Sequence, residues 1–485
     1  MFTIAGTVER KLWSEKFMEW FHKVLREAEI YEMRYPVKGC YIWMPYGMKL
    51  RNNIISLIKK LLDETGHQEV LFPTFIPEEF IRKESEHIAK FEDEIFWVVK
   101  GGKRELETRL ALRPTSETAI MPIFKLWIRA HTDLPLKIYQ VVSIFRCETK
   151  ATHPMIRVRE VTTFKEAHTA HATFEEAAKQ VEEAISIYRK FFDTLAIPYV
   201  ISRRPEWDKF PGAVYTIAFD TVLPDGKVLQ IGTAHNLGQN FSRAFEVTYL
   251  RPDGKHEYVY TTSYGISERV VAAVIAIHGD DRGLVLPPTV APIQVVIVPI
   301  YYKGQEEYVI SHCRKVAEYL RSRGFTVALD DRTDKTPGWK FYYWEMRGIP
   351  LRLEVGPRDI ENKVVTVVRR DTLERRTIAQ DMLDVELRKL LNEVYENLKQ
   401  RAWSWFNEHY HTASNIEEAS EKMKLGGIVE VPWCGSEECG LAIEDTLNAR
   451  VLGEPVDEYR KLRGKLKCIN CGKESDKVLR IAKTY

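Results

Sequence analysis

The sequence lacks any unbroken apolar run of about 18 residues, which is the length that a membrane-spanning helix requires. Charged residues also interrupt the first stretch, MFTIAGTVERKLWSEKF, so this stretch does not resemble a secretory signal. We therefore expect a protein without a membrane partner that resides in the cytoplasm, where thiols stay reduced.

The chain also has little net charge, because 71 Lys and Arg residues face 69 Asp and Glu residues. Net charge therefore indicates no nucleic-acid partner by itself, and any RNA contact must come from local patches. Basic patches at residues 367–376 and 461–467 are weak indicators, since a run of charge is usually a solvated surface. Seven cysteines, an odd number, argue against a disulfide framework.

The length of 485 residues predicts two or three domains. Strand and helix patterns up to about residue 288 predict a largely antiparallel sheet with helices against it, and the stretch 69–77 is predicted as a buried strand. A proline-bearing linker then precedes alternating strands and helices, with a final helix over about 377–400. We expect an α+β domain over 1–288, an α/β domain over 289–400 and a small α+β domain over 401–485.

Four of the cysteines lie close together near the end of the sequence. Cys434 and Cys439 are separated by four residues, and Cys468 and Cys471 by two. Two closely spaced thiolate pairs joined by a long loop suit tetrahedral zinc in a structural role. The alternative is four unrelated buried thiols.

The segment IFRCETKATHPMIRVRE carries charges that could bind a nucleotide. Arg146 and Glu148 alternate on a predicted strand, so we expect their side chains to face the same way, with Arg157 on the partner strand. Two arginines and a carboxylate on one sheet face could hold a phosphate and an exocyclic amine. The alternative is a cross-strand salt bridge on a solvated face.

Three sequence motifs resemble those of class II aminoacyl-tRNA synthetases. FRCE, with its loop and second arginine, resembles motif 2, GISER (265–269) resembles motif 3, and VLFPTFIPEEF resembles the end of motif 1 with its proline at Pro73. LRPTSET, GTAHNLGQNFS, HGDDRGLVLPP, PGWKFYYWEMRG and RLEVGPRD narrow the resemblance to prolyl-tRNA synthetases of the archaeal and eukaryotic-like type. The resemblance covers nearly the whole chain and implies the class II catalytic fold for residues 1–288.

The resemblance also implies a proline pocket. Thr115 and Glu117 resemble the residues that hold the proline imino group, Arg146 resembles the arginine that bridges the proline carboxylate and the ATP α-phosphate, and His235 resembles a pocket wall. A secondary ammonium group needs acceptors, and a carboxylate supplies a charge-assisted one. The alternatives are a helix N-terminal carboxylate for Glu117 and a structural role for His235.

The ATP site follows from the same resemblance. The residues implied in ATP binding are Arg146, Glu148, Arg157, Gln230, Thr233 and Arg269. Of these, Glu148 should accept a hydrogen bond from the adenine amine. One position departs from the class II pattern, because Val161 stands where many members carry the phenylalanine that stacks on adenine. Phe164 follows three residues later, and the sequence does not decide whether it substitutes.

The remaining expectations concern tRNA. The domain over 289–400 resembles the class IIa anticodon-binding domain, with Lys340, Arg347, Glu354 and Arg358 as candidates for reading two guanines; the alternative is surface charge. The terminal Tyr485 resembles a family tyrosine whose carboxylate approaches the catalytic domain.

The implied reaction is attack of the proline carboxylate on the α-phosphate of ATP, assisted by arginines and Mg²⁺, followed by transfer to the 3′ end of tRNA(Pro). The resemblance also implies a homodimer, since motif 1 forms the subunit interface in class II enzymes. The spacing of motifs 2 and 3 leaves no room for an editing insertion, and a proline-sized pocket is expected to reject cysteine and alanine poorly. The alternatives are another class II synthetase, of which the threonine enzyme is the nearest, an inactive RNA-binding or regulatory relative, and a zinc-finger nucleic-acid binder.

Overall fold

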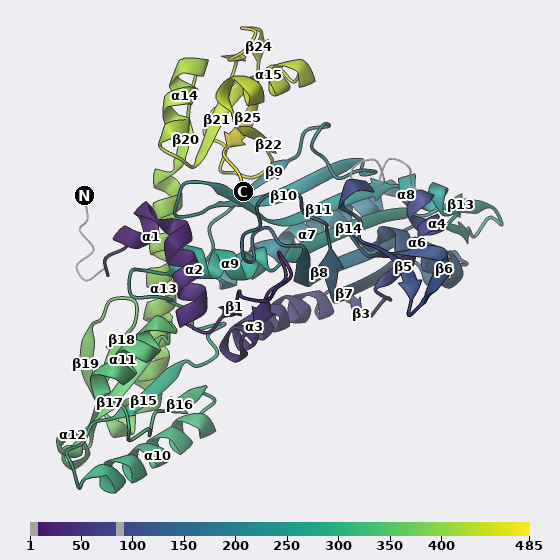
Figure 1. Ribbon diagram of the computed structural model, residues 1–485. Helices are drawn as coiled ribbons and strands as arrows, with labels where there is room; N and C mark the ends of the chain where they lie inside the picture. The colour runs from purple at the N-terminus through teal and green to yellow at the C-terminus, as the bar shows by residue number, and fades with distance from the viewer. Residues whose placement is uncertain (1–7, 84–91) are drawn as a thin grey trace.

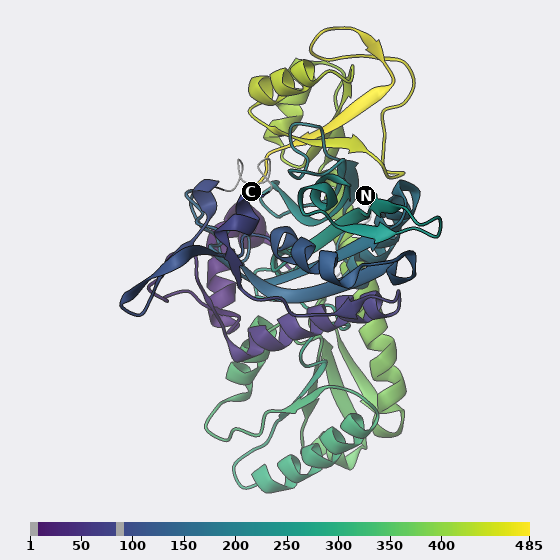
Figure 2. The same ribbon diagram turned by 90° about the vertical axis from the view of Figure 1, so that its right-hand side faces the viewer.

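A computed structural model describes residues 8–83 and 92–485 of the chain. Figures 1 and 2 show three parts stacked along one axis, with a central sheet and its helices in the middle. The unit formed by residues 295–400 lies below this central part, and the C-terminal residues lie above it. No helix among the described residues has the length and apolar character needed to cross a membrane.

Eleven strands of the described residues form the main sheet. Their spatial order is β20 (Tyr410–Thr412), β21 (Ile428–Trp433), β25 (Lys477–Ala482), β22 (Arg450–Pro455), β9 (Val200–Arg203), β10 (Tyr215–Val222), β11 (Val228–Gly238), β14 (Tyr260–Ser267), β8 (Glu160–His171), β7 (Leu136–Phe145) and β3 (Gln68–Glu69). All neighbours are antiparallel except β20–β21 and β3–β7. The predicted antiparallel sheet is therefore confirmed.

Helices α7 (Phe174–Thr194) and α9 (Arg269–His278) pack against β11 and β14 of this sheet. Thr173 caps α7 by accepting a hydrogen bond from the Glu176 N–H, as the Thr-x-x-Glu pattern requires. Tyr188 of α7 then contacts Phe219 and Tyr264 of the sheet edge-to-face. Burying such side chains contributes roughly 1.5–3 kcal/mol each, which fixes the sheet on its helix layer.

Shorter elements complete the first 288 residues. The helices are α1 (Lys11–Glu15), α2 (Phe17–Glu27), α3 (Pro45–Asp63), α4 (Glu78–Arg82), α6 (Glu117–Trp127) and α8 (Asn240–Ala244), with 3₁₀ turns at Glu92–Glu94 and His131–Asp133. The strands are β1 (Tyr31–Glu32), β2 (Ile42–Trp43), β4 (Phe75–Pro77), β5 (Trp97–Gly101), β6 (Arg104–Leu112), β12 (Thr248–Leu250) and β13 (His256–Tyr258).

The prediction of one buried strand over 69–77 is wrong. Strand β3 ends at Glu69 and joins the main sheet, whereas β4 begins at Phe75 and pairs with β6 in a separate three-stranded sheet. Pro73 lies between them, and a proline has no N–H to donate to a strand partner. The segment therefore passes from one sheet to the other instead of continuing one strand.

Residues 295–400 form a five-stranded sheet with helices. The strand order is β16 (Val327–Leu329), β15 (Val295–Pro299), β17 (Leu351–Val355), β18 (Val364–Arg369) and β19 (Arg375–Ala379), with the first three parallel and the rest antiparallel. The helices are α10 (Glu306–Ser322), α11 (Pro337–Met346), α12 (Pro357–Glu361) and α13 (Leu383–Glu408), with a 3₁₀ turn at Gln380–Met382. Strand β15 lies inside this sheet and is buried along its length, as its continuous apolar sequence predicts.

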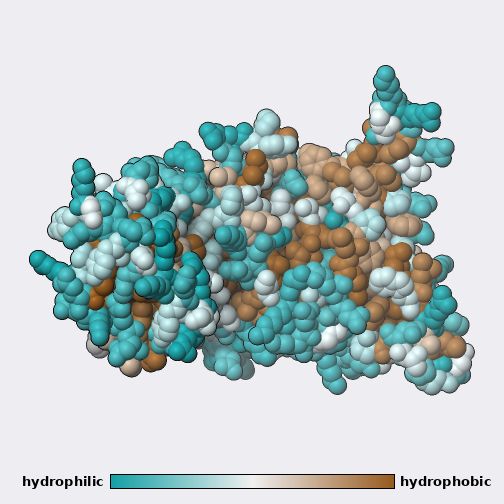
Figure 3. Space-filling view, turned by 90° about the horizontal axis from the view of Figure 1, so that it is seen from below, coloured by the Kyte–Doolittle hydropathy of each residue, from teal (hydrophilic) through white to brown (hydrophobic). Residues whose placement is uncertain are grey.

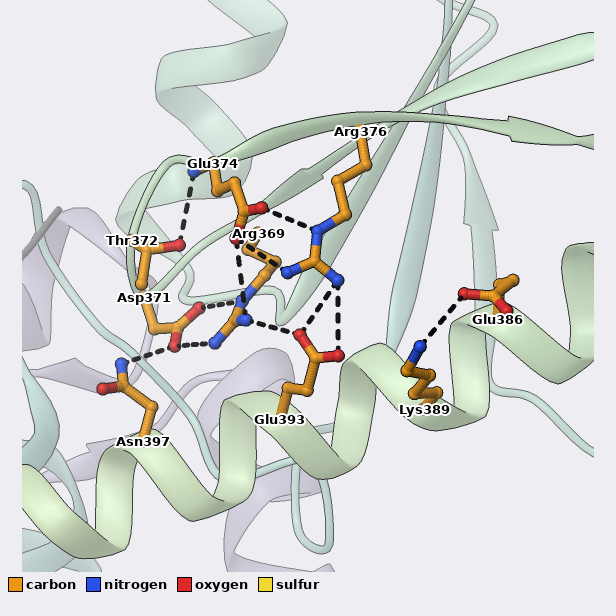
Figure 4. Close-up of polar contacts among 9 residues, drawn as sticks. All are labelled: Arg369, Asp371, Thr372, Glu374, Arg376, Glu386, Lys389, Glu393 and Asn397. Carbon is orange, nitrogen blue, oxygen red and sulfur yellow. Dashed lines mark hydrogen bonds and ion pairs between the residues drawn. The ribbon is translucent and has the colours of Figure 1, made fainter. Parts of the chain in front are cut away.

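The predicted helix over 377–400 is displaced. Residues 375–379 form β19, which pairs with β18, and α13 begins only at Leu383 and continues to Glu408. Figure 4 shows how the β18–β19 hairpin is joined to α13: Arg369 and Arg376 both pair with Glu393 of the helix. The hairpin therefore stays with the sheet because its buried Ile378 and its charges have partners there.

The C-terminal residues continue the main sheet. Helices α14 (Ile416–Lys424) and α15 (Glu437–Leu447) flank its strands β20, β21, β22 and β25, and β23 (Leu466–Lys467) pairs with β24 (Glu474–Ser475). Strand β22 pairs with β9, so the C-terminal strands and the central strands belong to one sheet. In Figure 1, α13 runs from the lower unit to the upper one, and the expected boundary at residue 400 lies inside this helix.

Candidate functional site

A cavity of about 470 Å³ opens on the central sheet. Strands β8, β10, β11 and β14 contribute to it, together with the loop between β7 and β8 and the loop between β9 and β10. The lining includes every residue that the sequence assigned to proline or ATP: Thr115, Glu117, Arg146, Glu148, Arg157, Gln230, Thr233, His235 and Arg269. The structure thus brings all nine together from segments far apart in the sequence.

A buried carboxylate, that of Glu117, lines the cavity. Glu117 is the first residue of α6 and is 2% exposed. The Thr115 hydroxyl donates a hydrogen bond to one of its oxygens, and the Ser263 hydroxyl donates to the other at 2.8 Å. The position at the helix N-terminus favours the negative charge of this carboxylate. A role as a helix N-terminal carboxylate is therefore compatible with a role as an acceptor for the proline imino group. The result is a fixed acceptor inside the cavity.

A second buried carboxylate, Glu166 of β8, also lines the cavity. It accepts hydrogen bonds from Ser116, the residue that precedes α6, and from Gln140 at 2.8 Å. His168, two residues further along β8, lies 3.1 Å from it. Burial lowers the pKa of His168, but the Glu166 carboxylate outweighs this effect and raises that pKa. This pair was not predicted, although Glu166 and His168 alternate on a strand and must share a face.

His235 of β11 also lines the cavity. Its Nδ1 lies 2.9 Å from the Thr216 hydroxyl, which also accepts the backbone N–H of Phe210 at 2.9 Å. The Phe210 ring lies 4.6 Å from the imidazole, centroid to centroid. These contacts fix the imidazole, and they make Phe210 an aromatic part of the wall that the sequence analysis missed.

Three arginines, Arg146, Arg157 and Arg269, line the same cavity. Arg269 is the first residue of α9, and its Nε donates to the Ile156 carbonyl at 2.8 Å. Burial, followed by the charges of Arg146 and Arg157, lowers the pKa of Arg269 to about 10. Burial also lowers the pKa of Arg146. Guanidinium groups brought this close together out of bulk water form a binding site for a polyanion.

The expected alternation of Arg146 and Glu148 on one strand is wrong. Strand β7 ends at Phe145, and the Glu148 N–H bonds to the Arg146 carbonyl at 2.7 Å, so the chain turns there. Arg157 likewise precedes β8. Glu148 and Arg157 lie 3.9 Å apart, with side chains 19% and 23% exposed. They therefore form part of the cavity wall instead of a salt bridge on a solvated sheet face.

Gln230 is held by an arginine that the sequence analysis missed. Arg204 donates to the Gln230 side-chain oxygen at 2.9 Å and to Asp220 at 2.8 Å. The other terminal nitrogen of Arg204 donates to the Leu452 carbonyl of the C-terminal unit. Thr233 lies further along the same strand, β11. Because Arg204 meets its partners only through the fold, no local sequence pattern reveals it.

A β-bulge determines which side chains of β8 enter the cavity. Ile144 pairs with Val161, and Val142 pairs with Phe164, so two steps along β7 match three along β8. The extra residue places Val161 and Phe164 on the same face, although their spacing of three would otherwise separate them. Both line the cavity. The aromatic ring that Val161 lacks is therefore present nearby.

Comparison with known proteins identifies the family. Residues 96–278 match the model for the tRNA synthetase class II core domain (G, H, P, S and T), residues 294–401 the anticodon binding domain, and residues 416–485 the prolyl-tRNA synthetase C-terminal model. Proline–tRNA ligase of Saccharolobus islandicus is 54% identical over 99% of this chain and 100% of its own, and that of Pyrobaculum calidifontis is 56% identical over 96% of both. This chain belongs to the proline–tRNA ligase family. The predicted class II synthetase fold is confirmed.

Solved structures agree with this family assignment. Prolyl-tRNA synthetase of Giardia lamblia in complex with prolyl-adenylate superposes with a TM-score of 0.94 at 38% identity, over 99% of this chain and 100% of that one. The enzyme of Cryptosporidium parvum, complexed with halofuginone and AMPPNP, gives a TM-score of 0.92 at 37% identity, over 99% of both chains.

The four C-terminal cysteines of this proline–tRNA ligase family member converge. The sulfur atoms of Cys434, Cys439, Cys468 and Cys471 all lie within 4.8 Å of one another. The Asn470 side chain donates to the Cys439 sulfur at 3.3 Å. A backbone hydrogen bond from Lys473 lowers the pKa of Cys471 to about 7. Four converging thiols fit a tetrahedral metal site.

The candidate anticodon residues are mostly buried. Lys340 donates to the Asp330 carbonyl at 2.9 Å, Arg347 pairs with a glutamate of the N-terminal segment at 2.7 Å, and Glu354 accepts hydrogen bonds from two arginines. Of the four, Arg358 alone is exposed. The assignment of these residues to tRNA stays a prediction.

Tyr485 lies beside the loop between β7 and β8. Its hydroxyl donates to Asp225 at 2.5 Å, and its ring lies edge-to-face with His153 of that loop, 6.0 Å between centroids. Burial raises its pKa. The C-terminal residue therefore contacts the loop that carries Glu148 and Arg157, while the role of its carboxylate stays a prediction.

Proposed function

We propose that this chain is a proline–tRNA ligase that activates proline with ATP to prolyl-adenylate and transfers the prolyl group to the 3′ end of tRNA(Pro). The observation that carries the proposal is a single cavity lined both by a buried carboxylate and by three arginines. The carboxylate of Glu117 suits a secondary ammonium group, and the guanidinium groups of Arg146, Arg157 and Arg269 suit carboxylate and phosphate oxygens.

For the amino acid, we assign the imino group to Glu117 and Thr115. Ser263 and Thr115 hold the Glu117 carboxylate, so little reorganisation is needed on binding. We assign the proline ring to the wall formed by the Phe210 ring and the His235 imidazole. An apolar wall rejects near-isosteres poorly, so we expect cysteine and alanine to be misactivated.

For activation, we assign the proline carboxylate and the α-phosphate to Arg146, and the triphosphate to Arg157 and Arg269. The carboxylate is already a nucleophile at neutral pH, so the reaction needs alignment and neutralisation of oxygen charge instead of a general base. Glu148 is assigned to the adenine amine. Mg²⁺ bound with ATP would add charge neutralisation, and we assign Gln230 and Thr233 to this wall of the site.

For tRNA, the exposed face of α11 offers a surface that suits an unpaired base. Trp339 and Tyr343 stack with centroids 5.0 Å apart, and the Arg332 guanidinium lies 4.8 and 4.4 Å from their centroids. Asp330 fixes this arginine through two hydrogen bonds. Bases of any identity stack on such cation–aromatic surfaces, so we assign this stack to the anticodon loop together with Arg358.

For the C-terminal unit, we propose that Cys434, Cys439, Cys468 and Cys471 hold zinc. Bound as four thiolates, the ion has no position open to substrate, so its contribution is to stability and shape.

For assembly, we propose a homodimer through an apolar surface. Leu71, Phe75, Leu126 and Trp127 are 79%, 50%, 59% and 47% exposed, and the Trp127 ring lies 5.8 Å from that of Phe72, next to Leu71. Figure 3 shows hydrophobic surface gathered over the larger, right-hand part of the molecule. Apolar surface of this kind marks contact between proteins. We further propose a cytoplasmic enzyme without editing in cis.

The test is pyrophosphate exchange with each amino acid. We expect proline to support exchange, and Arg146→Ala to lower the rate by roughly 10²- to 10³-fold, the usual cost of removing one donor to a developing oxyanion. Arg104→Ala, on the exposed β5–β6 hairpin, is the matched control and should not change the rate. Absence of exchange with proline would refute the proposed function. Unchanged exchange by Arg146→Ala would refute the site assignment alone.

A further inference from the structure

The loop between β9 and β10, residues 204–214, forms one wall of the catalytic cavity. Its lining residues are Arg204, Asp208, Lys209, Phe210 and Pro211. Within the loop, the Asp208 and Lys209 N–H groups bond to the Pro205 carbonyl, the Ala213 N–H bonds to the Phe210 carbonyl, and Lys209 pairs with Glu206 at 2.7 Å. Two further hydrogen bonds, from the Phe210 N–H to Thr216 and from the Asn240 side chain to the Gly212 carbonyl, both at 2.9 Å, tie its second half to the catalytic part. The position of this wall therefore depends on what the loop packs against.

Trp207, in the middle of this loop, packs on the C-terminal unit. It lies against the apolar cluster that contains Cys439, Cys468 and Trp433. The rings of Trp207 and Trp433 meet edge-to-face, with centroids 6.3 Å apart. Trp433 directly precedes Cys434 in the sequence. A loop of the catalytic cavity is thus anchored among the residues of the cysteine cluster.

Gly440 makes this packing possible. It follows Cys439 in α15, and a Cβ added to it would lie 2.6 Å from Cζ2 of Trp207, which is closer than atoms can approach. The backbone of Gly440 has ordinary helical geometry, which any residue could adopt. A glycine is needed here because a side chain would collide with the indole of Trp207. The contact is therefore specific in shape as well as apolar.

We propose that Trp207 is a positioning residue through which the cysteine cluster fixes the wall of the catalytic cavity. A metal held by the four thiolates would fix the start of α15 and the residues after Trp433, which together form the seat of the indole. The loop then presents Phe210 to His235, 4.6 Å away, and Arg204 to Gln230, 2.9 Å away. The hydrogen bond from Arg204 to the Leu452 carbonyl is a second connection between the same two parts. The proposal rests on the proposed function for its catalytic consequence.

The test uses Gly440→Ala, with Thr446→Ala as the matched control because Thr446 is exposed on the same helix. Alanine favours a helix, so Gly440→Ala should keep the fold and the zinc content while displacing the indole. Hydrogen–deuterium exchange should become faster at residues 205–213 and stay unchanged in α7. Binding of a non-hydrolysable prolyl-adenylate analogue should weaken by roughly 10- to 100-fold, as for other small misplacements of a binding wall. The control should match the wild type in both measurements.

A second variant keeps the proposal falsifiable if Gly440→Ala does not fold or loses zinc. Trp207→Ala should give the same two changes, and Trp207→Phe should reverse most of them. Adding Gly440→Ala to Trp207→Ala should cost nothing more, because the clashing indole is gone. The proposal would be overturned if zinc-loaded Gly440→Ala, or Trp207→Ala, kept the wild-type rate of hydrogen–deuterium exchange at residues 205–213 and the wild-type affinity for the prolyl-adenylate analogue. A wild-type chain without proline-dependent activity would contradict the proposed function. Hydrogen–deuterium exchange would still show whether Trp207 holds the loop of residues 204–214 in place.

Discussion

The buried ion pair between Asp280 and Arg370 joins the catalytic part to the unit of residues 295–400. Arg370 donates two hydrogen bonds to Asp280, both at 2.7 Å. Asp280 is 0% exposed and Arg370 is 3% exposed. Asp280 follows α9, whose first residue Arg269 lines the cavity, and Arg370 follows β18. Arg401 donates to the carbonyl of His278, the last residue of α9.

The expected magnitude follows from the charges around Asp280. Removing one partner of a buried pair costs about 3–5 kcal/mol, because the other charge is left without compensation. Burial lowers the pKa values of Arg10 and Arg401, and the Asp280 charge raises both, so this carboxylate serves three guanidinium groups. We therefore expect Asp280→Asn to destabilise the protein more than Arg370→Met, which leaves Asp280 with two cations.

The assay is urea unfolding of both single variants and the double variant. Because the pair is coupled, the double variant should lose less stability than the sum of the two single variants. Aminoacylation of tRNA should also fall more than pyrophosphate exchange, since the unit of residues 295–400 loses its anchor. Glu386 and Lys389 of α13, 4.0 Å apart on the surface in Figure 4, provide the control pair, whose removal should have little effect. Additive losses in the double variant would refute the reasoning.

Four further predictions follow from the structure. Burial lowers the pKa of Lys165 to about 7, whereas a lysine in an unfolded chain has a pKa near 10.4. At pH values between these two, Lys165 is protonated in the unfolded chain and neutral in the folded one. The free energy of unfolding should therefore rise with pH in this window, by up to about 1.4 kcal/mol per unit, and Lys165→Met should remove that slope in urea titrations at pH 7.5 and 8.5. Trp339→Ala should lower kcat/KM for tRNA by about tenfold without changing pyrophosphate exchange, whereas Tyr308→Ala, an exposed aromatic of α10, should change neither. Cys468→Ser should lower the zinc content and the unfolding temperature, as metal analysis and calorimetry would show. Leu126→Asp should shift the molecule from dimer to monomer in light scattering, and a dimer that persists would place the interface elsewhere.

The residues of the cavity could be predicted because they lie in short, ordered motifs. Thr115 and Glu117 are two residues apart, and Gln230, Thr233 and His235 follow one another along β11. Residues this close in the sequence can be identified together from a single motif. The buried strand β15 could be predicted from its continuous apolar sequence.

The local backbone of the site could not be predicted as well. Periodicity assumes regular strands, and the functional segments depart from them: β7 stops before Arg146, and the bulge in β8 moves Phe164 to the face of Val161. Arg204 and Trp207 were not predicted because their contacts depend on the fold: Arg204 reaches Gln230 on another strand and Leu452 in the C-terminal unit, and Trp207 packs against Gly440. Such long-range contacts leave no pattern in the sequence.

The order of strands explains why the catalytic cavity and the C-terminal unit depend on each other. Strand β22 of the C-terminal unit pairs with β9, and β9 leads directly into the loop that carries Arg204 and Trp207. On the other side, β10 and β11 carry Thr216, Gln230 and His235. Because sheet pairing fixes neighbouring strands in register, any shift of β22 is passed to β9 and from there to the cavity wall. The C-terminal unit is therefore a structural extension of the catalytic sheet, and the residues around its cysteine cluster pack against Trp207 of the loop of residues 204–214.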